Sequence, residues 1–366
     1  MEKEIYYSRD SRALVVTSIE ELGSFSPIIY GNRFKYDYLL VIGNGFDLNL
    51  GLKTTYRDFV NSCIFKKMYE KRMEEKRTNS NSQPSLLDYL YGKQFDEKWY
   101  DIEEALLEYV SKKPDGTFVN NSKEDKKDYD DVCGSLIEYL SSLFKTGNDL
   151  EQSKKMKITP AGKLIEKLNF NRTERNVVYS FNYTPINLII RAIACESRLD
   201  PVRVHGEIQE DVIFDGNVND SAIILGFEIS DINNIAPGYS FMIKSNNLAY
   251  KSTDIAFDLL NSRNVIFFGH SLNQMDFGYF EDYFKVLASN TEKQRKLIIF
   301  TKDEDSRVVL LDNIRKMGIS VRDIYTHASL DFIRTDYIDN EDSVDSVLFK
   351  KLLNKIEESS YQTTEL

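Results

Sequence analysis

Four short polar motifs contain the residue types that could do chemistry in this chain. Each directly follows an apolar run, and together they supply two asparagines, two histidines and two aspartates. They read Gly43-Asn44-Gly45-Phe46-Asp47, Ser180-Phe181-Asn182-Tyr183-Thr184, Val204-His205-Gly206, and Gly269-His270-Ser271 with Asp276 shortly after. An imidazole can exchange a proton near neutral pH, and a neighbouring amide can hold a water or a sugar hydroxyl. Asn182 and His205 are therefore the predicted reactive pair.

The first motif also predicts a phosphate site. The apolar run 38–42 has the composition of a buried strand and ends abruptly at Gly43. From Thr54 onward the chain has the hydroxyl cap and apolar spacing of a helix start. A strand, a glycine turn and a helix in this order present free backbone N–H groups to a phosphate, and glycines let the backbone approach it closely. Without a ligand, the same pattern is a tight turn.

The remaining motif residues are expected to complete a nucleotide site. Asp47 is the side chain best suited to bond a ligand hydroxyl, although it could instead cap its own turn. Ser271 is expected to contact phosphate or ribose. The predicted cofactor-binding residues are Gly43, Asn44, Gly45, Phe46, Asp47, Thr184, Gly269, His270, Ser271 and Asp276.

Each histidine has a second interpretation. His205 could be a core histidine bonded to a carbonyl, but Gly206 after it and Asn182 at a neighbouring strand end favour a site. His270 also follows a predicted strand and is the second candidate for the general base. His327 lies outside these motifs and is predicted to be structural.

The elements that must position these motifs alternate between apolar strands and helices. This alternation predicts an α/β fold, a Rossmann-like parallel sheet with helices on both faces. The polar motifs then fall at the carboxyl ends of the strands, where open α/β sheets bind ligands. The predicted strands are 38–42, 176–181, 202–204, 222–225, 265–268 and 296–300.

The pattern divides the chain into four parts. An N-terminal extension, 1–35, includes one plausible strand at 13–18 and has no assigned role. The α/β domain covers 36–340, and a mainly helical insertion, 54–170, follows its first strand. A C-terminal helical tail covers 341–366. The helices predicted in these parts are 54–77, 86–90, 95–110, 132–144, 186–195, a helix from about 275, 305–317 and 343–359.

Composition narrows the class of protein. The chain has 366 residues and a net charge of −11, which argues against general binding to nucleic acid. Cys63, Cys133 and Cys195 lie too far apart for a zinc motif or a disulfide framework and are expected to be reduced core thiols. No membrane span or signal peptide is apparent. These features predict a cytoplasmic protein with no membrane partner.

Several of these motifs together resemble the AbiH family, bacterial proteins of phage abortive infection. The first is Gly-Asn-Gly-Phe-Asp-Leu, followed by Gly-Leu-Lys-Thr-Thr-Tyr-x-x-Phe. The others are Trp99-x-Asp101-x-Glu103, Ser-Phe-Asn-Tyr-Thr, and Gly-His-Ser-Leu with Asp276 and Tyr279-Phe280. The resemblance implies a role in anti-phage defence, with a homo-oligomer or a second defence protein as possible partners.

The order of the motifs is also similar to that of the sirtuin-like (DHS-like) NAD-binding fold. Sirtuin-related defence proteins cleave the N-glycosidic bond of NAD with an Asn and a His, which correspond here to Asn182 and His205. The chain departs from sirtuins in its first motif, where Gly-Ala-Gly-x-Ser would stand. It also has Thr184 where an Asp commonly follows the Asn. The lack of a zinc-binding cysteine cluster argues against a deacylase.

Three hypotheses follow. The first is a defence protein that binds and hydrolyses a nucleotide, with NAD as the favoured substrate and no metal. The second is a nucleotide-sensing or partner-binding module with no catalysis, which the missing acid at Thr184 favours. The third is a metal-dependent nuclease built on Asp47, Asp101 and Glu103, although the same acids could be helix packing and solvated charge.

Overall fold

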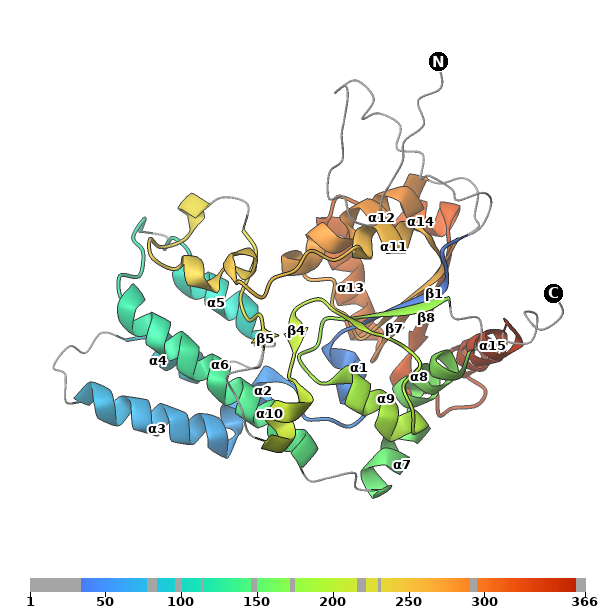
Figure 1. Cartoon of the computed structure of the whole chain (residues 1–366). Coiled ribbons are helices and arrows are strands. Elements are labelled where there is room, and N and C mark those ends of the chain that lie inside the picture. Colours follow the sequence, from blue (N-terminus) through green and yellow to red (C-terminus); the bar gives the residue numbers. More distant parts are fainter. Residues whose placement is uncertain are drawn as a thin grey trace, which may run out of the picture.

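The computed structural model describes residues 34–77, 84–95, 101–113, 115–145, 150–171, 175–215, 222–229, 232–289 and 295–359. Figure 1 shows a central sheet with helices on both faces and a separate lobe of helices beside the sheet. The predicted strand at 13–18 lies outside the described residues.

The central sheet has six strands, and all of its neighbouring pairs are parallel. Its strand order is β3-β2-β1-β6-β7-β8, so that in chain order the strands lie 3-2-1-4-5-6. This is the strand order of a doubly wound sheet. The chain adds strands outward on one side from β1 to β3, then returns to the centre at β6 and adds strands on the other side, so the switch point lies between β1 and β6. The strands are β1 (Tyr36–Ile42), β2 (Asn176–Ser180), β3 (Val202–Arg203), β6 (Ser262–Phe268), β7 (Lys296–Thr301) and β8 (Ser329–Arg334). The prediction of a parallel α/β sheet is confirmed.

Alternating side chains of the strands enter two separate cores. In β1, Leu40 and Ile42 belong to one core, while Leu39 and Val41 belong to the other. Because side chains alternate across a strand, an uninterrupted apolar run needs helices on both faces. The first core is completed mainly by α8 (Pro160–Phe170), α9 (Ile186–Ala194) and α15 (Val344–Ser359). The second is completed by α11 (Ile255–Leu260), α12 (Phe277–Ser289), α13 (Glu304–Lys316) and α14 (Val321–His327).

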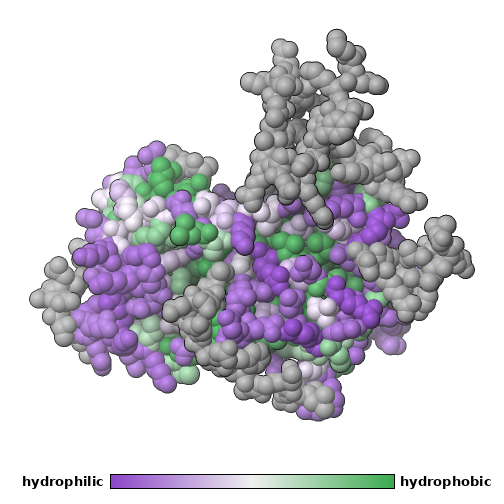
Figure 2. Space-filling model, viewed as in Figure 1, coloured by the Kyte–Doolittle hydropathy of each residue, from purple (hydrophilic) through white to green (hydrophobic). Residues whose placement is uncertain are grey.

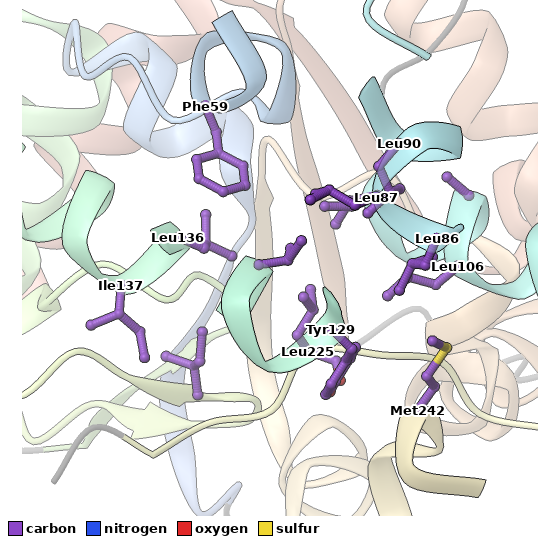
Figure 3. Close-up of a cluster of buried hydrophobic side chains, with 14 of the residues drawn as sticks. Phe59, Leu86, Leu87, Leu90, Leu106, Tyr129, Leu136, Ile137, Leu225 and Met242 are labelled. Carbon is purple, nitrogen blue, oxygen red and sulfur yellow. The ribbon is translucent and has the colours of Figure 1, made fainter. Parts of the chain in front are cut away.

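The helical lobe has a third core of its own (Figure 3). Its main helices are α2 (Tyr56–Asn61), α3 (Cys63–Arg77), α4 (Leu86–Lys93), α5 (Ile102–Val110), α6 (Ser122–Lys145) and α10 (Glu210–Asp215). The outer surface over α3 is largely hydrophilic (Figure 2). The helical segment after β1 therefore serves two cores, because α7 (Leu150–Ile158) and α8 pack with the sheet rather than with the lobe. Helix α15 also packs on α8 and β8, so the C-terminal helix completes the sheet's covering layer.

Buried carboxylates fix the start of α4 within this lobe. Asp125 accepts a hydrogen bond from the backbone N–H of Leu86 at 2.9 Å, and Asp128 accepts one from Leu87 at 3.2 Å. Arg72 donates to Asp128 at 2.8 Å and supplies the compensating charge. Both aspartates lie on the N-terminal half of α6, which begins at Ser122, ten residues before the predicted helix 132–144. The charged character of that half comes from these buried ion pairs as well as from solvated residues.

Several predicted elements differ from the structure. Residues 222–225 do not join the central sheet, because β5 (Ala222–Ile223) pairs antiparallel with β4 (Gly206–Glu207). Strand β8 was not predicted, since its edge position leaves most of its side chains half-buried and its sequence polar. Helix α5 begins at Ile102, later than predicted, and 96–100 lie outside the described residues. The expectation of core thiols is wrong for Cys63 and Cys195, which are exposed.

A helix begins directly after the glycine turn, which was not predicted. Helix α1 (Asn44–Asn49) follows Gly43, and α2 starts separately with Thr55 as its N-cap. The turn after β6 passes so close to α1 that a Cβ on Gly269 would lie 2.4 Å from the Cα of Gly45. Gly269 also has φ of 64°, a conformation that side chains disfavour. Two glycines are therefore needed where these two turns meet.

Replacing Gly269 with Ala is expected to lower the free energy of unfolding by about 3 kcal/mol, because overpacking adds to the left-handed backbone strain. Urea denaturation followed by circular dichroism would measure the change. Gly278→Ala is the matched control, since a Cβ there meets nothing within 4 Å. An equally small effect of both substitutions would contradict the close contact of the two turns.

Candidate functional site

A cavity of about 370 Å³ lies at the carboxyl ends of β1, β2 and β6. It thus includes the switch point between β1 and β6, where the strand order changes side. All predicted site residues line it except Gly45 and Phe46. They are joined by side chains from the helical lobe and by Val309 of α13. The lobe residues in the lining are Thr54, Thr55, Tyr56, Phe59, Asp101, Glu103, Glu104, Leu136, Tyr139 and Leu140. The sheet thus supplies most of one wall, and the lobe supplies much of the other.

The glycine turn does not present the row of free N–H groups that the sequence predicted. The N–H groups of Gly43, Gly45 and Phe46 donate to the carbonyls of Phe268, Gly269 and Gly43, at 3.1, 3.0 and 2.9 Å. The Phe46 side chain is fully buried and packs on the ring of Phe268 instead of facing the cavity. The close contact between the two turns explains the glycines. The three N–H groups named above already donate to backbone carbonyls and are not free to bind a phosphate.

Asn182 and Asp47 meet at the edge between β1 and β2. The Asn182 side-chain amide donates to the Gly43 carbonyl at 3.0 Å, which fixes it at the end of β1. Thr184 donates its hydroxyl to Asp47 Oδ2 at 2.8 Å. The second carboxylate oxygen, Asp47 Oδ1, is buried without a hydrogen-bond partner among the described residues. Thr184, where sirtuins commonly have an acid, therefore contacts an acid that comes from the neighbouring strand end.

Burial raises the pKa of Asp47 to about 7, although the hydrogen bond from Thr184 and the nearby Asn182 amide favour its ionised form. Such a carboxyl changes protonation state in the physiological range, as a general acid or base must. Its free oxygen and its place in the cavity wall make it the group best suited to proton transfer at this strand end.

His270 and Asp276 form a pair at the end of β6. The backbone N–H of Leu272 donates to His270 Nδ1 at 3.0 Å, so the ring proton of the neutral imidazole lies on Nε2. That nitrogen faces Asp276 Oδ2 at 3.4 Å. Burial would raise the pKa of Asp276, but His270 and the charge of Lys244 hold it well below the usual range. Ser271 is exposed at the cavity rim.

His205 lies between this pair and a buried lysine. The Lys244 ammonium is 3.3 to 3.4 Å from the two ring nitrogens, and His205 Nε2 is 3.6 Å from Asp276 Oδ1. Burial and the positive charge of Lys244 lower the pKa of His205 to about 3. The imidazole is therefore neutral at physiological pH, and it packs edge-on against the ring of Phe181.

Lys244 is a site residue that sequence reasoning missed. Its side chain is 1% exposed and donates to Glu103 Oε2 at 2.7 Å, while Tyr183 donates to Oε1 at 2.7 Å. Burial raises the pKa of Glu103 to about 7 despite the attraction of Lys244. The backbone here passes so close to Gly226 that a Cβ would lie 2.1 Å from the carbonyl of Met242. In sequence, one lysine in an irregular segment gives no signal of this role.

Two of the three carboxylates in the nuclease hypothesis, Asp101 and Glu103, are engaged with separate protein groups. Asp101 caps α5 and accepts from the side chain of Asn273 at 2.9 Å. Glu103 is bound by Lys244 and Tyr183, as described above. Across the residues described by the structure, no three or more potential metal ligands come together. The donor arrangement gives no support to that hypothesis.

One further predicted residue lies apart from the cavity, and one lies outside the described residues. His327 ends α14 and is partly exposed, away from the cavity lining. Trp99, part of the family signature, lies outside the described residues. No helix within the described ranges is both long and apolar enough to cross a bilayer.

The fold is that of an α/β protein with a parallel sheet, and its cavity lies where doubly wound sheets commonly bind ligands. A family model described as bacteriophage abortive infection AbiH matches residues 39–300. The chain belongs to the AbiH family, which indicates a role in abortive infection by bacteriophage. The matched range includes all four polar motifs but ends before β8 and α15. In the other comparisons, no curated protein and no solved structure matched the chain.

Proposed function

We propose that this AbiH protein hydrolyses the N-glycosidic bond of a nucleotide in the cavity at the switch point, with NAD as the favoured substrate. The observation that carries the proposal is that Asn182 and Asp47 lie close together where the neighbouring strands β1 and β2 end. A fixed amide there lies beside a carboxyl whose pKa is about 7 and whose Oδ1 is free. Asp47 thus supplies an acid beside Asn182, whereas the sirtuin-like pattern has its acid two residues after the Asn. NAD is favoured because the order of the motifs in this chain is similar to that of the sirtuin-like fold.

The charge of the cavity agrees with this reaction. When the bond between ribose C1′ and the nicotinamide nitrogen breaks, its electron pair goes to the positively charged ring and leaves nicotinamide neutral. No general acid is needed, so a neutral His205 is compatible with the step. Positive charge develops on the ribose instead. The ionised and buried Asp276, whose lowered pKa is described above, supplies negative charge in the same cavity.

Water then adds to C1′ and loses a proton. Asp47 is the proposed general base, since the residue lines the cavity, its Oδ1 has no hydrogen-bond partner among the described residues, and its pKa is near neutrality. Asn182 would hold the water or the ribose beside it. The products are nicotinamide, ADP-ribose and one proton. His205, the base or acid suggested by the motif alone, is given a positioning role because its pKa of about 3 makes it a weak base.

The pyrophosphate would remain near the mouth of the cavity. Asp47, Asp101, Glu103, Glu104 and Asp276 all line the cavity, and an anionic group among ionised carboxylates is repelled. The N–H groups of the glycine turn are also already donated. The cavity volume of about 370 Å³ falls in the range of small-molecule sites, about 300 to 1,000 Å³.

Cells that express the protein should lose NAD on phage infection, whereas cells with the Asn182→Ala variant should keep it. Total NAD would be measured by an enzymatic cycling assay before and after infection, together with phage yield. Glu104→Gln is a control for removal of a carboxylate at the cavity rim, because Glu104 is exposed. Constant NAD during a successful block of infection would contradict NAD cleavage and favour the sensing module, which shares the cavity but leaves its ligand unchanged.

A further inference from the structure

The buried carboxylate of Asp276 has one oxygen that the protein does not use. Asp276 Oδ2 faces His270 Nε2 at 3.4 Å, and Oδ1 has no hydrogen-bond partner among the described residues. The side chain is 8% exposed and lines the cavity. An unpaired buried acceptor costs about 1 to 3 kcal/mol, and more when it is charged, so such atoms call for an explanation.

The charged and polar groups around Asp276 Oδ1 indicate what kind of ligand group could bind there. A second cation is disfavoured, because the Lys244 ammonium already lies close enough to lower the pKa of both His205 and Asp276. His205 Nε2 lies 3.6 Å from this oxygen. The Lys244 ammonium lies 3.4 Å from Nδ1 and 3.3 Å from Nε2 of this ring. In the tautomer whose Nδ1 accepts from Lys244, the proton of the neutral ring lies on Nε2, toward the carboxylate. A hydroxyl, which both donates and accepts, matches this acceptor and this donor together.

The opposite wall of the cavity has a different chemistry. Phe59, Leu136, Tyr139 and Leu140 line it from α2 and α6, and the rings of Phe59 and Tyr139 lie 5.7 Å apart. Figure 3 shows Phe59 and Leu136 facing the same interior space of the lobe core. Apolar and aromatic side chains suit a flat heterocycle. The cavity therefore combines a polar end for hydroxyls with an apolar wall for a base.

We propose that Asp276 Oδ1, with His205 beside it, is a subsite for a ribose hydroxyl, so that the site selects ribosyl over deoxyribosyl compounds. The inference rests on the proposed function for the identity of the sugar, and it deepens that function by naming the substrate class. A site built to bond a hydroxyl rejects the analogue that lacks it, because its own buried group is then left unpaired. Asp276 thus determines specificity, while Asp47 performs proton transfer.

Equilibrium binding of nicotinamide riboside and of its 2′-deoxy and 3′-deoxy analogues tests this inference. Isothermal titration calorimetry on the full chain carrying Asp47→Asn, which slows cleavage in the proposed mechanism, would give each Kd. One of the two deoxy analogues is expected to bind about 10- to 100-fold more weakly than the riboside, the usual effect of losing a hydrogen bond to a charged group. Adding Asp276→Asn should bring the riboside and that analogue to within about threefold, and adding Glu104→Gln instead should leave the discrimination unchanged.

Equal binding of the riboside and both analogues to the chain with intact Asp276 would overturn the inference, whatever the variants do. Discrimination that survives Asp276→Asn would also overturn it, as would no binding of any probe at millimolar concentration. The result is separable from the proposed function. Selective binding without nicotinamide release would reject cleavage and keep the hydroxyl subsite, and release without selectivity would do the reverse.

Discussion

Replacing Asp47 with Asn is expected to lower the rate of nicotinamide release by about 100- to 10,000-fold, the usual contribution of a general base. Asn has nearly the shape of Asp and its side-chain oxygen can still accept from Thr184, whose hydroxyl is 2.8 Å from Asp47 Oδ2. The fold should therefore persist while proton transfer is lost. Because the base must be deprotonated, the wild-type rate should rise with pH through about 7, the pKa to which burial raises Asp47. The pH–rate profile of kcat/KM measures both effects.

Thr184→Val is the matched variant for this prediction. It removes the hydroxyl that stabilises the ionised form of Asp47, so the rising limb of the profile should move to higher pH while the maximal rate changes less. If Asp47→Asn keeps the wild-type rate, and its pH–rate profile still rises near pH 7, the general base must be another residue.

Replacing Lys244 with Met is expected to lower the free energy of unfolding by about 3 to 5 kcal/mol at pH 8, because the Glu103 carboxylate is then buried without its cation. The loss should shrink as pH falls. Burial already raises the pKa of Glu103 to about 7, and removal of Lys244 raises it further. A carboxyl with a raised pKa in the folded state destabilises the fold as pH rises from its unfolded value toward the folded one, and its protonation relieves this cost. Urea denaturation at pH 5.5 and pH 8 measures the difference.

The double variant Lys244→Met with Glu103→Gln separates the unpaired charge from the loss of packing. It should be more stable at pH 8 than Lys244→Met alone, and its stability relative to wild type should depend less on pH. A double variant as unstable as the single one would mean that the packing of the Lys244 stem, rather than its charge, holds this part of the lobe together.

The central sheet could be predicted because its strands carry their own signal. β1, β2, β6 and β7 are short apolar runs that end in glycine or polar residues, so their positions followed from the sequence, and a cavity lies where the polar motifs were expected to meet. β8 lacked this signal, since half-burial at a sheet edge permits Asp331 and Arg334 in the strand. The run 222–225, which contains β5, looked like part of the same sheet, because an apolar run does not specify its partner.

The chemistry of the cavity was less predictable than its location. Lys244 and Glu103 are 141 residues apart in sequence, and only the fold shows that they form one buried ion pair. The glycine motif correctly indicated a tight turn after a strand. It could not show that the N–H groups of the turn donate to the carbonyls of Phe268, Gly269 and Gly43, which removed the predicted phosphate cradle. Nor could it show that Asp47 would lie beside Thr184. The sequence has Thr184 where sirtuins commonly have an Asp, and the fold brings a carboxyl to that place from another part of the chain.

The most direct measurement is nicotinamide released from NAD by the purified wild-type chain and by Asp47→Asn, followed by liquid chromatography. The proposed function predicts equal amounts of nicotinamide and ADP-ribose from the wild type and at least about 100-fold slower release from the variant. Intact NAD after long incubation with folded wild-type protein, with or without phage lysate, would contradict hydrolysis. Equal rates from the two proteins would contradict the role of Asp47.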